Sequence, residues 1–304
     1  MSTVVSRFEM WLHQPAPPER LAAMRIAVGS FVTLYMAFNV REFDRLAARS
    51  SEGFAPIGLA RVLDAPLSAA AIWVLFAALV LGGAAFTLGI AARVSGPAFA
   101  TLVLFWTSYH SSWGQLLHFE HLFTLHVMIL ALAPTAEAWA PGAPDSMEPS
   151  ARFGWPLRLL AIATAVTYVL SGIAKLRNSG WAWFDAETLA THIGYSATRM
   201  ETIGSRQPPL AGAVLENQWA IPAMAAAALM IELGAPLALT TPRLRNIWVT
   251  AAVVFHAATA ATMHVFFGYQ GLAVAMLPLF AIERVPEYVR DNLARFHHRT
   301  VGPT

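Results

Sequence analysis

Lys175 is the residue of this sequence best suited to act as a base. Among 20 basic residues it is the only lysine, and all the others are arginine. Arginine stays charged in proteins, whereas a partly buried lysine can lose its proton. Lys175 ends an apolar run one turn after Ser171-Gly172, a small pair that allows another helix to pack closely. It is therefore a candidate base facing other helices; the alternative is an anchor in the lipid headgroups.

A second group of polar residues occupies the stretch Leu117-His118-Phe-Glu120-His121. On a continuous helix, His118 and His121 would lie one turn apart on one face and could chelate a metal together with Glu120. No His-Glu-x-x-His run or second histidine-rich segment accompanies them, and cysteine is absent, so no metal is expected. The alternative role is hydrogen bonding between helices, which contributes about 0.6 kcal/mol per bond.

Three further ionisable residues lie within apolar runs, where such side chains are costly and commonly functional: Arg25, Glu232 and His256. Arg25 is expected to pair with a carboxylate such as Glu232, or to extend toward the headgroups. Glu232 precedes Gly234 and Pro236, which can interrupt a helix, and is expected to be either paired or protonated. Aromatic side chains that could line a flat apolar pocket are Phe105, Trp106, Tyr109 and Tyr168.

Composition sets the class of protein in which these residues act. The 304 residues are 57% hydrophobic and 12% charged, whereas soluble domains carry about 25% charged residues. The sequence therefore predicts an all-α integral membrane protein. The net charge of +2 comes from scattered arginines without a basic block, which argues against nucleic acid as a partner.

Apolar runs predict a bundle of about eight transmembrane helices, with seven or nine as alternatives. We expect an N-terminal interfacial segment (1–19) without a cleavable signal, a transmembrane domain (20–285) and a polar C-terminal tail (286–304). Loop arginines favour both termini in the cytoplasm. No internal repeat is evident, which weakens a transporter built from inverted halves. The eight runs are Leu21–Val40, Ala69–Ala91, Gly96–His110, Leu116–Leu132, Leu157–Ala174, Ala220–Thr240, Ile247–Phe267 and Gly268–Ile282.

The run Tyr168-x-x-Ser-Gly172-x-x-Lys175-Leu, followed by Trp181, resembles the signature of the horizontally transferred transmembrane (HTTM) domain family. That family includes the membrane part of vitamin K-dependent gamma-glutamyl carboxylase. The resemblance covers about residues 20–285. Further stretches that agree in order and spacing are Arg25-Ile-x-x-Gly29, His121-Leu-x-x-Leu, Ala133-Pro134, Glu232-x-x-x-Pro236-Leu, Arg243-x-Arg245, Phe255-His256 and Phe267-Gly268.

This resemblance implies roles for two residues. Lys175 matches the carboxylase lysine that takes a proton from the reduced quinone, and His121 matches a histidine beside the reacting quinone oxygen. The carboxylase has Asn where this chain has Glu120, and it continues into a large lumenal domain, so carboxylation of a docked protein is not implied.

The leading hypothesis is a membrane enzyme, carboxylase-like, that deprotonates a lipid-soluble quinol-like cofactor or substrate. Lys175 would be the base and His121 its partner, and a reduced, vitamin K-like quinone would contact Trp106, Tyr109 and Tyr168. The expected location is the bacterial cytoplasmic membrane, with membrane lipids as partners. The alternatives are a non-catalytic maturation or immunity partner of a secreted peptide, and a proton-coupled carrier. The surrounding polar cluster would comprise Glu120, His118, Arg25, Glu232 and His256.

Overall fold

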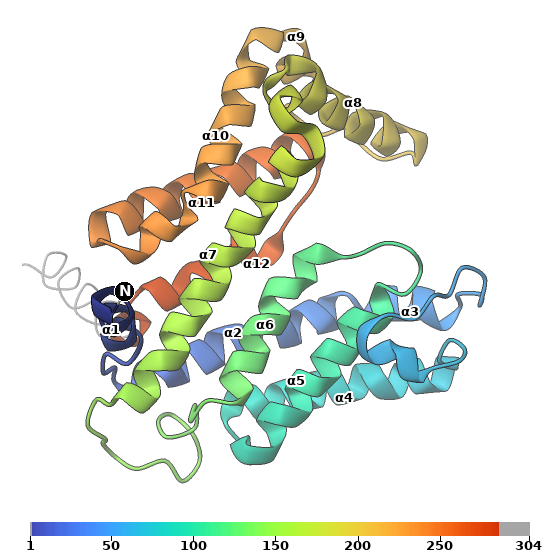
Figure 1. The fold of residues 1–304 in the computed structure, drawn as a ribbon. Helices are drawn as coiled ribbons and strands as arrows, with labels where there is room; N and C mark the ends of the chain where they lie inside the picture. Colours follow the sequence, from blue (N-terminus) through green and yellow to red (C-terminus); the bar gives the residue numbers. More distant parts are fainter. Residues whose placement is uncertain (1, 286–304) are drawn as a thin grey trace, which may run out of the picture. The chain divides into compact units, whose positions relative to one another are not determined.

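The computed structural model describes residues 2–285 and divides into two compact units (Figure 1). The first unit comprises Met1–Leu160 and Phe280–Thr304, and the second comprises Ala161–Leu279. In the described range the regular elements are helices, together with one isolated bridge between Ala16 and Ser150. The predicted all-α class is therefore confirmed. The predicted polar tail, 286–304, lies outside the described residues.

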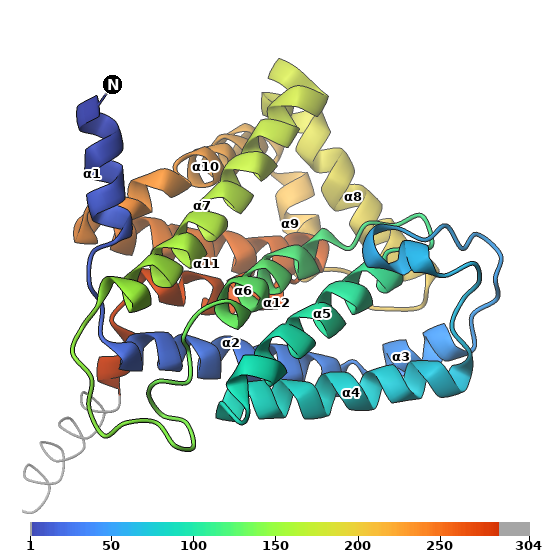
Figure 2. The same ribbon diagram turned by 60° about the horizontal axis from the view of Figure 1, so that its bottom comes forward.

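The first unit is built on helices that pack side by side. In Figure 2, α2 (Pro18–Phe38), α4 (Ala69–Leu88) and α5 (Ala92–His110) run alongside one another, and α6 (His121–Ala131) packs on α5. The short α3 (Val40–Ala47) continues α2 after a break at Asn39. An N-terminal helix, α1 (Ser2–Leu12), precedes them, and short 3₁₀ helices η1 (Gly58–Val62), η2 (His118–Glu120) and η7 (Ile282–Arg284) complete the unit.

Arg25 ties the ends of these helices together. Its side chain is fully buried and donates to the backbone carbonyls of Thr87 at 3.2 Å, Thr135 at 2.5 Å and Trp139 at 2.6 Å. The predicted carboxylate partner is therefore wrong, because carbonyls left over at helix ends and in the loop before α7 take its donors. Gly89 makes room for this: it has φ +73°, and a Cβ there would lie 2.9 Å from an Arg25 guanidinium nitrogen.

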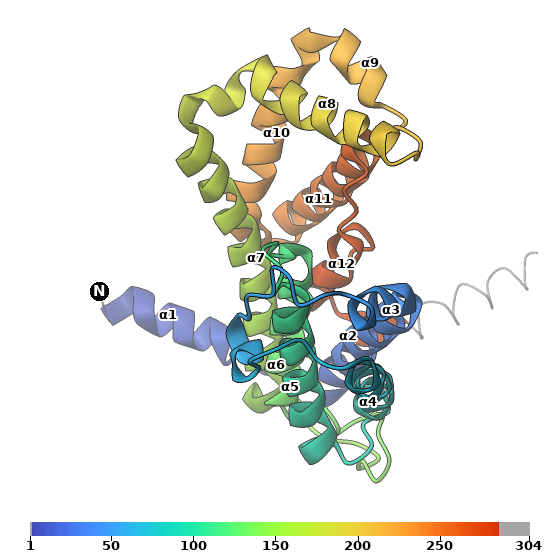
Figure 3. The ribbon, with the colours of Figure 1, turned by 90° about the vertical axis from the view of Figure 1, so that its right-hand side faces the viewer.

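The second unit begins within α7 (Ala151–Ser179) and ends at η6 (Val274–Leu279). Figure 3 shows α8 (Ala186–Thr202) and α9 (Ala211–Glu216) beside α10 (Ile221–Leu233) and α11 (Pro242–Met263). The remaining elements are η3 (Gly180–Phe184), η4 (Gln218–Ala220), η5 (Ala235–Leu239) and α12 (Gly268–Gly271).

An apolar core holds α8, α9 and α10 together. Trp183 lies in it, 6% exposed, with Leu189, Ile193 and Leu229, and its indole N–H donates to the Ala225 carbonyl at 3.1 Å. Trp183 therefore packs in the protein, and not in the aromatic belt at the membrane interface that a Trp-rich loop would suggest.

Four described helices are long and apolar enough to cross a membrane: α2, α4, α7 with the adjoining η3, and α11. They coincide with four of the predicted spans, and the total number of spans stays a prediction. Three other predicted runs are interrupted. The run 116–132 contains η2 and the eleven-residue α6, the run 220–240 breaks where Gly234 and Pro236 follow α10, and the run 268–282 contains α12 and η6.

Candidate functional site

The candidate base Lys175 contacts Glu232 directly. Lys175, near the end of α7, places its Nζ 2.5 Å from Oε1 of Glu232, near the end of α10. The Glu232 side chain is 4% exposed and that of Lys175 is 26% exposed. The Lys175 ammonium nitrogen also lies 5.4 Å from the centre of the Trp183 ring. Glu232 is therefore paired with Lys175.

Close packing of α7 on α10 brings this pair together. A Cβ at Gly172 would lie 2.8 Å from a Leu233 methyl carbon and 3.2 Å from Cβ of Glu232. The glycine therefore allows a close approach that a larger residue would permit only if Leu233 moved, as expected from the Ser171-Gly172 pair. Because Tyr168, Gly172 and Lys175 are spaced four and three residues apart, they share this face of α7.

Tyr168 extends the polar face toward α11. Its hydroxyl shares a 2.7 Å hydrogen bond with Nε2 of His256, and its ring packs edge-on against Trp248 at 4.9 Å. The three residues are 5–6% exposed. The second unit therefore holds two buried polar pairs, Lys175 with Glu232 and Tyr168 with His256.

Some polar atoms of this unit are buried without a hydrogen-bond partner in the described part of the chain. They are Oε2 of Glu232, Nδ1 of His256 and Oε1 of Gln270. A buried polar atom without a partner costs about 1–3 kcal/mol, so each of these atoms requires an explanation such as a bound water, an ion or a catalytic role.

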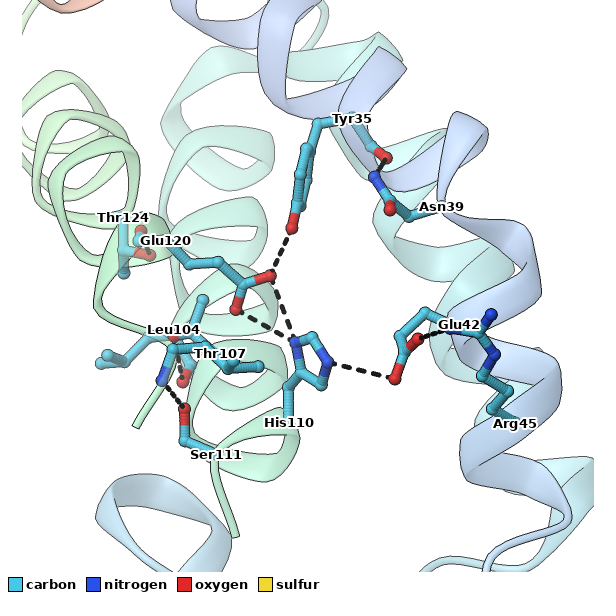
Figure 4. A network of polar contacts seen from close by, with 11 residues as sticks. Tyr35, Asn39, Glu42, Arg45, Leu104, Thr107, His110, Ser111, Glu120 and Thr124 are labelled. Atoms are coloured by element: carbon cyan, nitrogen blue, oxygen red, sulfur yellow. Dashed lines mark hydrogen bonds and ion pairs between the residues drawn. The ribbon is translucent and has the colours of Figure 1, made fainter. Parts of the chain in front are cut away.

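A different polar network occupies the first unit (Figure 4). The fully buried Glu120 accepts a 2.7 Å hydrogen bond from the Tyr35 hydroxyl, and its carboxylate oxygens lie 3.2 and 3.3 Å from Nδ1 of His110. Nε2 of His110 lies 3.4 Å from Glu42, which also accepts a 2.9 Å hydrogen bond from Arg45. An imidazole with a carboxylate at each nitrogen donates from both, which requires the protonated form.

The pKa of the Glu42 carboxyl is lowered by its two partners. The hydrogen bond from His110 lowers the pKa of the Glu42 carboxyl, and the one from Arg45 adds to that effect against the opposing effect of burial. Glu42 lies on α3, outside the membrane-crossing helices. The network thus carries two carboxylates on either side of one imidazolium.

The two aromatic residues predicted in this unit to line a cofactor pocket are occupied by protein contacts. Trp106 stacks on Phe43 with ring centres 3.9 Å apart and on His110 at 4.9 Å. Tyr109 is fully buried, and its hydroxyl accepts from the backbone N–H of Leu67 at 3.1 Å. Trp106 therefore packs against the imidazole of His110, Tyr109 bonds to the loop at Leu67, and the third predicted residue, Tyr168, lies in the second unit.

His118 and His121, for which no metal is expected, do not share one helix. His118 lies on the 3₁₀ helix η2, and His121 is the first residue of α6. Both side chains are exposed. No group of three or more metal-binding side chains occurs in residues 2–285. His121 belongs to the first unit and Lys175 to the second, so their partnership stays a prediction.

Tyr35 and Glu42 were not among the site residues expected from the sequence. Together with Asn39 they follow one another at intervals of four and three residues, at the end of the first apolar run. That polar stripe is a signal for a shared helical face, although a break at Asn39 separates α2 from α3. Because of this break, helical periodicity alone does not predict that Tyr35 and Glu42 lie at the same site.

The long apolar helices and the buried ionisable pairs define an all-helical membrane protein with polar sites inside its helical units. The HTTM domain model matches residues 13–283, and the chain belongs to the HTTM domain family. No curated protein and no solved structure matches the chain in the same comparisons.

Proposed function

We propose that the second unit is an acid–base site that takes a proton from a lipid-soluble, quinol-like molecule. The observation that carries this proposal is the 2.5 Å contact between Lys175 and the 4%-exposed Glu232, whose second carboxylate oxygen has no partner in the described residues. A positioned base in a site of low dielectric constant can remove a proton from a weak acid.

Lys175 accepts the proton as a neutral amine, in the state in which the proton shared by the pair lies on Glu232. The O–H bond of the donor breaks, the donor becomes an anion, and the pair becomes an ammonium beside a carboxylic acid.

Other residues of the unit suit a ligand of this class. A quinol, when bound, supplies an acidic O–H and a ring that delocalises the resulting charge. Tyr168 and Trp248 offer flat apolar surfaces, and the unpartnered Gln270 oxygen can accept a hydrogen bond from a second hydroxyl. The Tyr168–His256 hydrogen bond can stabilise the oxyanion that forms.

The class of enzyme and the membrane in which it acts are proposed from the family and the loop charges. Family membership and the resemblance around Lys175 favour a carboxylase-like enzyme that uses a reduced quinone, with His121 assisting. The charge pattern of the loops favours both termini inside, and the bacterial cytoplasmic membrane is part of the proposal.

The test is the deprotonation of a quinol by the purified protein. Menadiol is added without oxygen, and its absorbance reports the pH at which it becomes the anion. With the wild-type protein we expect this pH to fall by at least one unit relative to the Lys175→Arg variant, because a guanidinium cannot act as the base.

Arg177→Lys, an exposed change on the same helix, is the matched control and should behave as wild type. An unaltered response in Lys175→Arg that is folded and inserted would overturn the proposed base. Native mass spectrometry of the purified protein should detect a co-purifying quinone. Complex formation with a secreted peptide that survives loss of Lys175 and His121 would favour the non-catalytic alternative.

A further inference from the structure

A pocket in the first unit lies beside the His110 network and is separate from the site proposed above. Its volume is about 280 Å³, which suits a small ligand or a single functional group. Its lining combines one carboxylate, the imidazole and three aromatic rings. The lining residues are Tyr35, Asn39, Glu42, Arg49, His110, Trp113, Gln115, Leu117 and Phe119.

Arg49 lines this pocket, and without it the less exposed charges sum to a negative value. Glu120 is fully buried, Glu42 is 26% exposed, and together they face the single positive charge of His110, which is 11% exposed. Figure 4 shows the imidazole between the two carboxylates. Arg45 also pairs with Glu42, but its side chain is 74% exposed and solvent screens it. Arg49 balances this negative charge, so a cationic ligand would take the place of the Arg49 guanidinium.

The walls of the pocket suit an organic cation. Tyr35, Trp113 and Phe119 present aromatic rings, whose faces attract cations. One cation–π contact of this kind is already present, because the Arg49 guanidinium carbon lies 4.7 Å from the centre of the Trp113 ring. Arg49 is exposed and follows α3 in a loop, so a ligand can compete with it for the ring.

The edge of the pocket adds hydrogen-bond acceptors. Asn39 uses its side-chain N–H₂ to donate to the Tyr35 carbonyl at 2.8 Å, which leaves its side-chain oxygen as an acceptor. Gln115 supplies another amide oxygen at the lining. Acceptors and a carboxylate are the groups that ammonium and guanidinium donors require.

We propose that this pocket binds a small organic cation carrying a primary ammonium or guanidinium group, with Glu42 as its counter-ion and Trp113 as its aromatic wall. Arg49 occupies part of the site when the ligand is absent. The proposal depends on neither Lys175 nor quinol chemistry.

The experiment uses the full-length protein in detergent and follows tryptophan fluorescence during titration. The probes are n-butylammonium and methylguanidinium, with n-butanol and butyrate as the neutral and anionic counterparts. We expect saturable binding of both cations and none of the counterparts. Equal binding of butyrate or butanol, or no saturable cation binding, would overturn the proposal.

Three variants identify the residues involved. Glu42→Gln should weaken n-butylammonium binding at least tenfold, whereas Glu52→Gln, an exposed acid in the nearby loop, should leave it unchanged. Arg49→Gln should strengthen binding several-fold by removing the internal competitor, a gain that a misfolded protein cannot produce. Binding that is insensitive to Glu42→Gln, or weakened by Arg49→Gln, would refute the assignment. Lys175→Arg should retain cation binding, which separates this test from that of the proposed function.

Discussion

Lys175 and Glu232 should show a large energetic coupling, which a double-mutant cycle can measure. In Lys175→Met, the Glu232 carboxylate loses its only hydrogen-bond partner in the described residues while its side chain stays 4% exposed. Breaking a buried pair by removing one partner costs about 3–5 kcal/mol. We expect a loss of about 3 kcal/mol in the free energy of unfolding, at the lower end because the carboxylate can take up a proton.

The reverse change should cost less. In Glu232→Leu, Lys175 remains, but its side chain is 26% exposed and its amine can reach solvent. We therefore expect a loss of about 1 kcal/mol. In the double variant two apolar side chains replace the pair, a change that is often neutral, so its loss should be no more than about 1 kcal/mol. The coupling energy is then about 3 kcal/mol.

The assay is equilibrium unfolding of the purified protein in detergent, followed by tryptophan fluorescence. Arg177→Met, combined with Glu232→Leu, forms a control cycle, because Arg177 is exposed near the same end of α7. The control changes should be additive within about 0.5 kcal/mol. A Lys175–Glu232 coupling below that limit would show that the 2.5 Å contact contributes nothing measurable, and the reasoning about a strongly interacting buried pair would fail.

Two further predictions concern the first unit. Arg25→Leu should reduce the free energy of unfolding by more than about 3 kcal/mol, because each lost bond to a charged donor contributes about 1.5–3 kcal/mol. Thermal unfolding measures this, Arg41→Leu at an exposed position is the control, and equal stability of the two variants would contradict it. The lowered pKa of Glu42 makes its stabilisation full above the ordinary value of 4.5 and lost as the pH falls through the lower folded value. The stability difference between wild type and Glu42→Gln should therefore persist from pH 7 to about 4.5 and vanish below it; a difference that disappears near neutral pH would exclude this origin.

Sequence reasoning was most successful where the signal is local. A run of about 20 apolar residues is a property of adjacent positions, and it located α2, α4, α7 and α11 as membrane-crossing candidates. It was less successful where a break inside an apolar run matters. The run 116–132 reads as one span, but its helix begins only at His121, where Glu120 packs against Tyr35 and His110.

Residue type and composition alone selected Lys175, Glu232 and His256, because ionisable groups in apolar runs are costly enough to require a reason. Tyr168 was selected as an aromatic side chain that could line a pocket. The same reasoning supplied no partner for Arg25 other than a carboxylate. Backbone carbonyls can accept its donors equally well, and only the positions of the helix ends show that they do.

The sequence by itself determined the class of this protein and its chemically unusual residues, since hydrophobicity and charge are read from each position and its neighbours. Only the tertiary structure decided which residues meet. Lys175 and Glu232 are 57 positions apart, Tyr35 and Glu120 are 85 apart, and Tyr168 and His256 are 88 apart. Such contacts depend on how helices pack, through close approaches such as the one at Gly172, and no local periodicity encodes them.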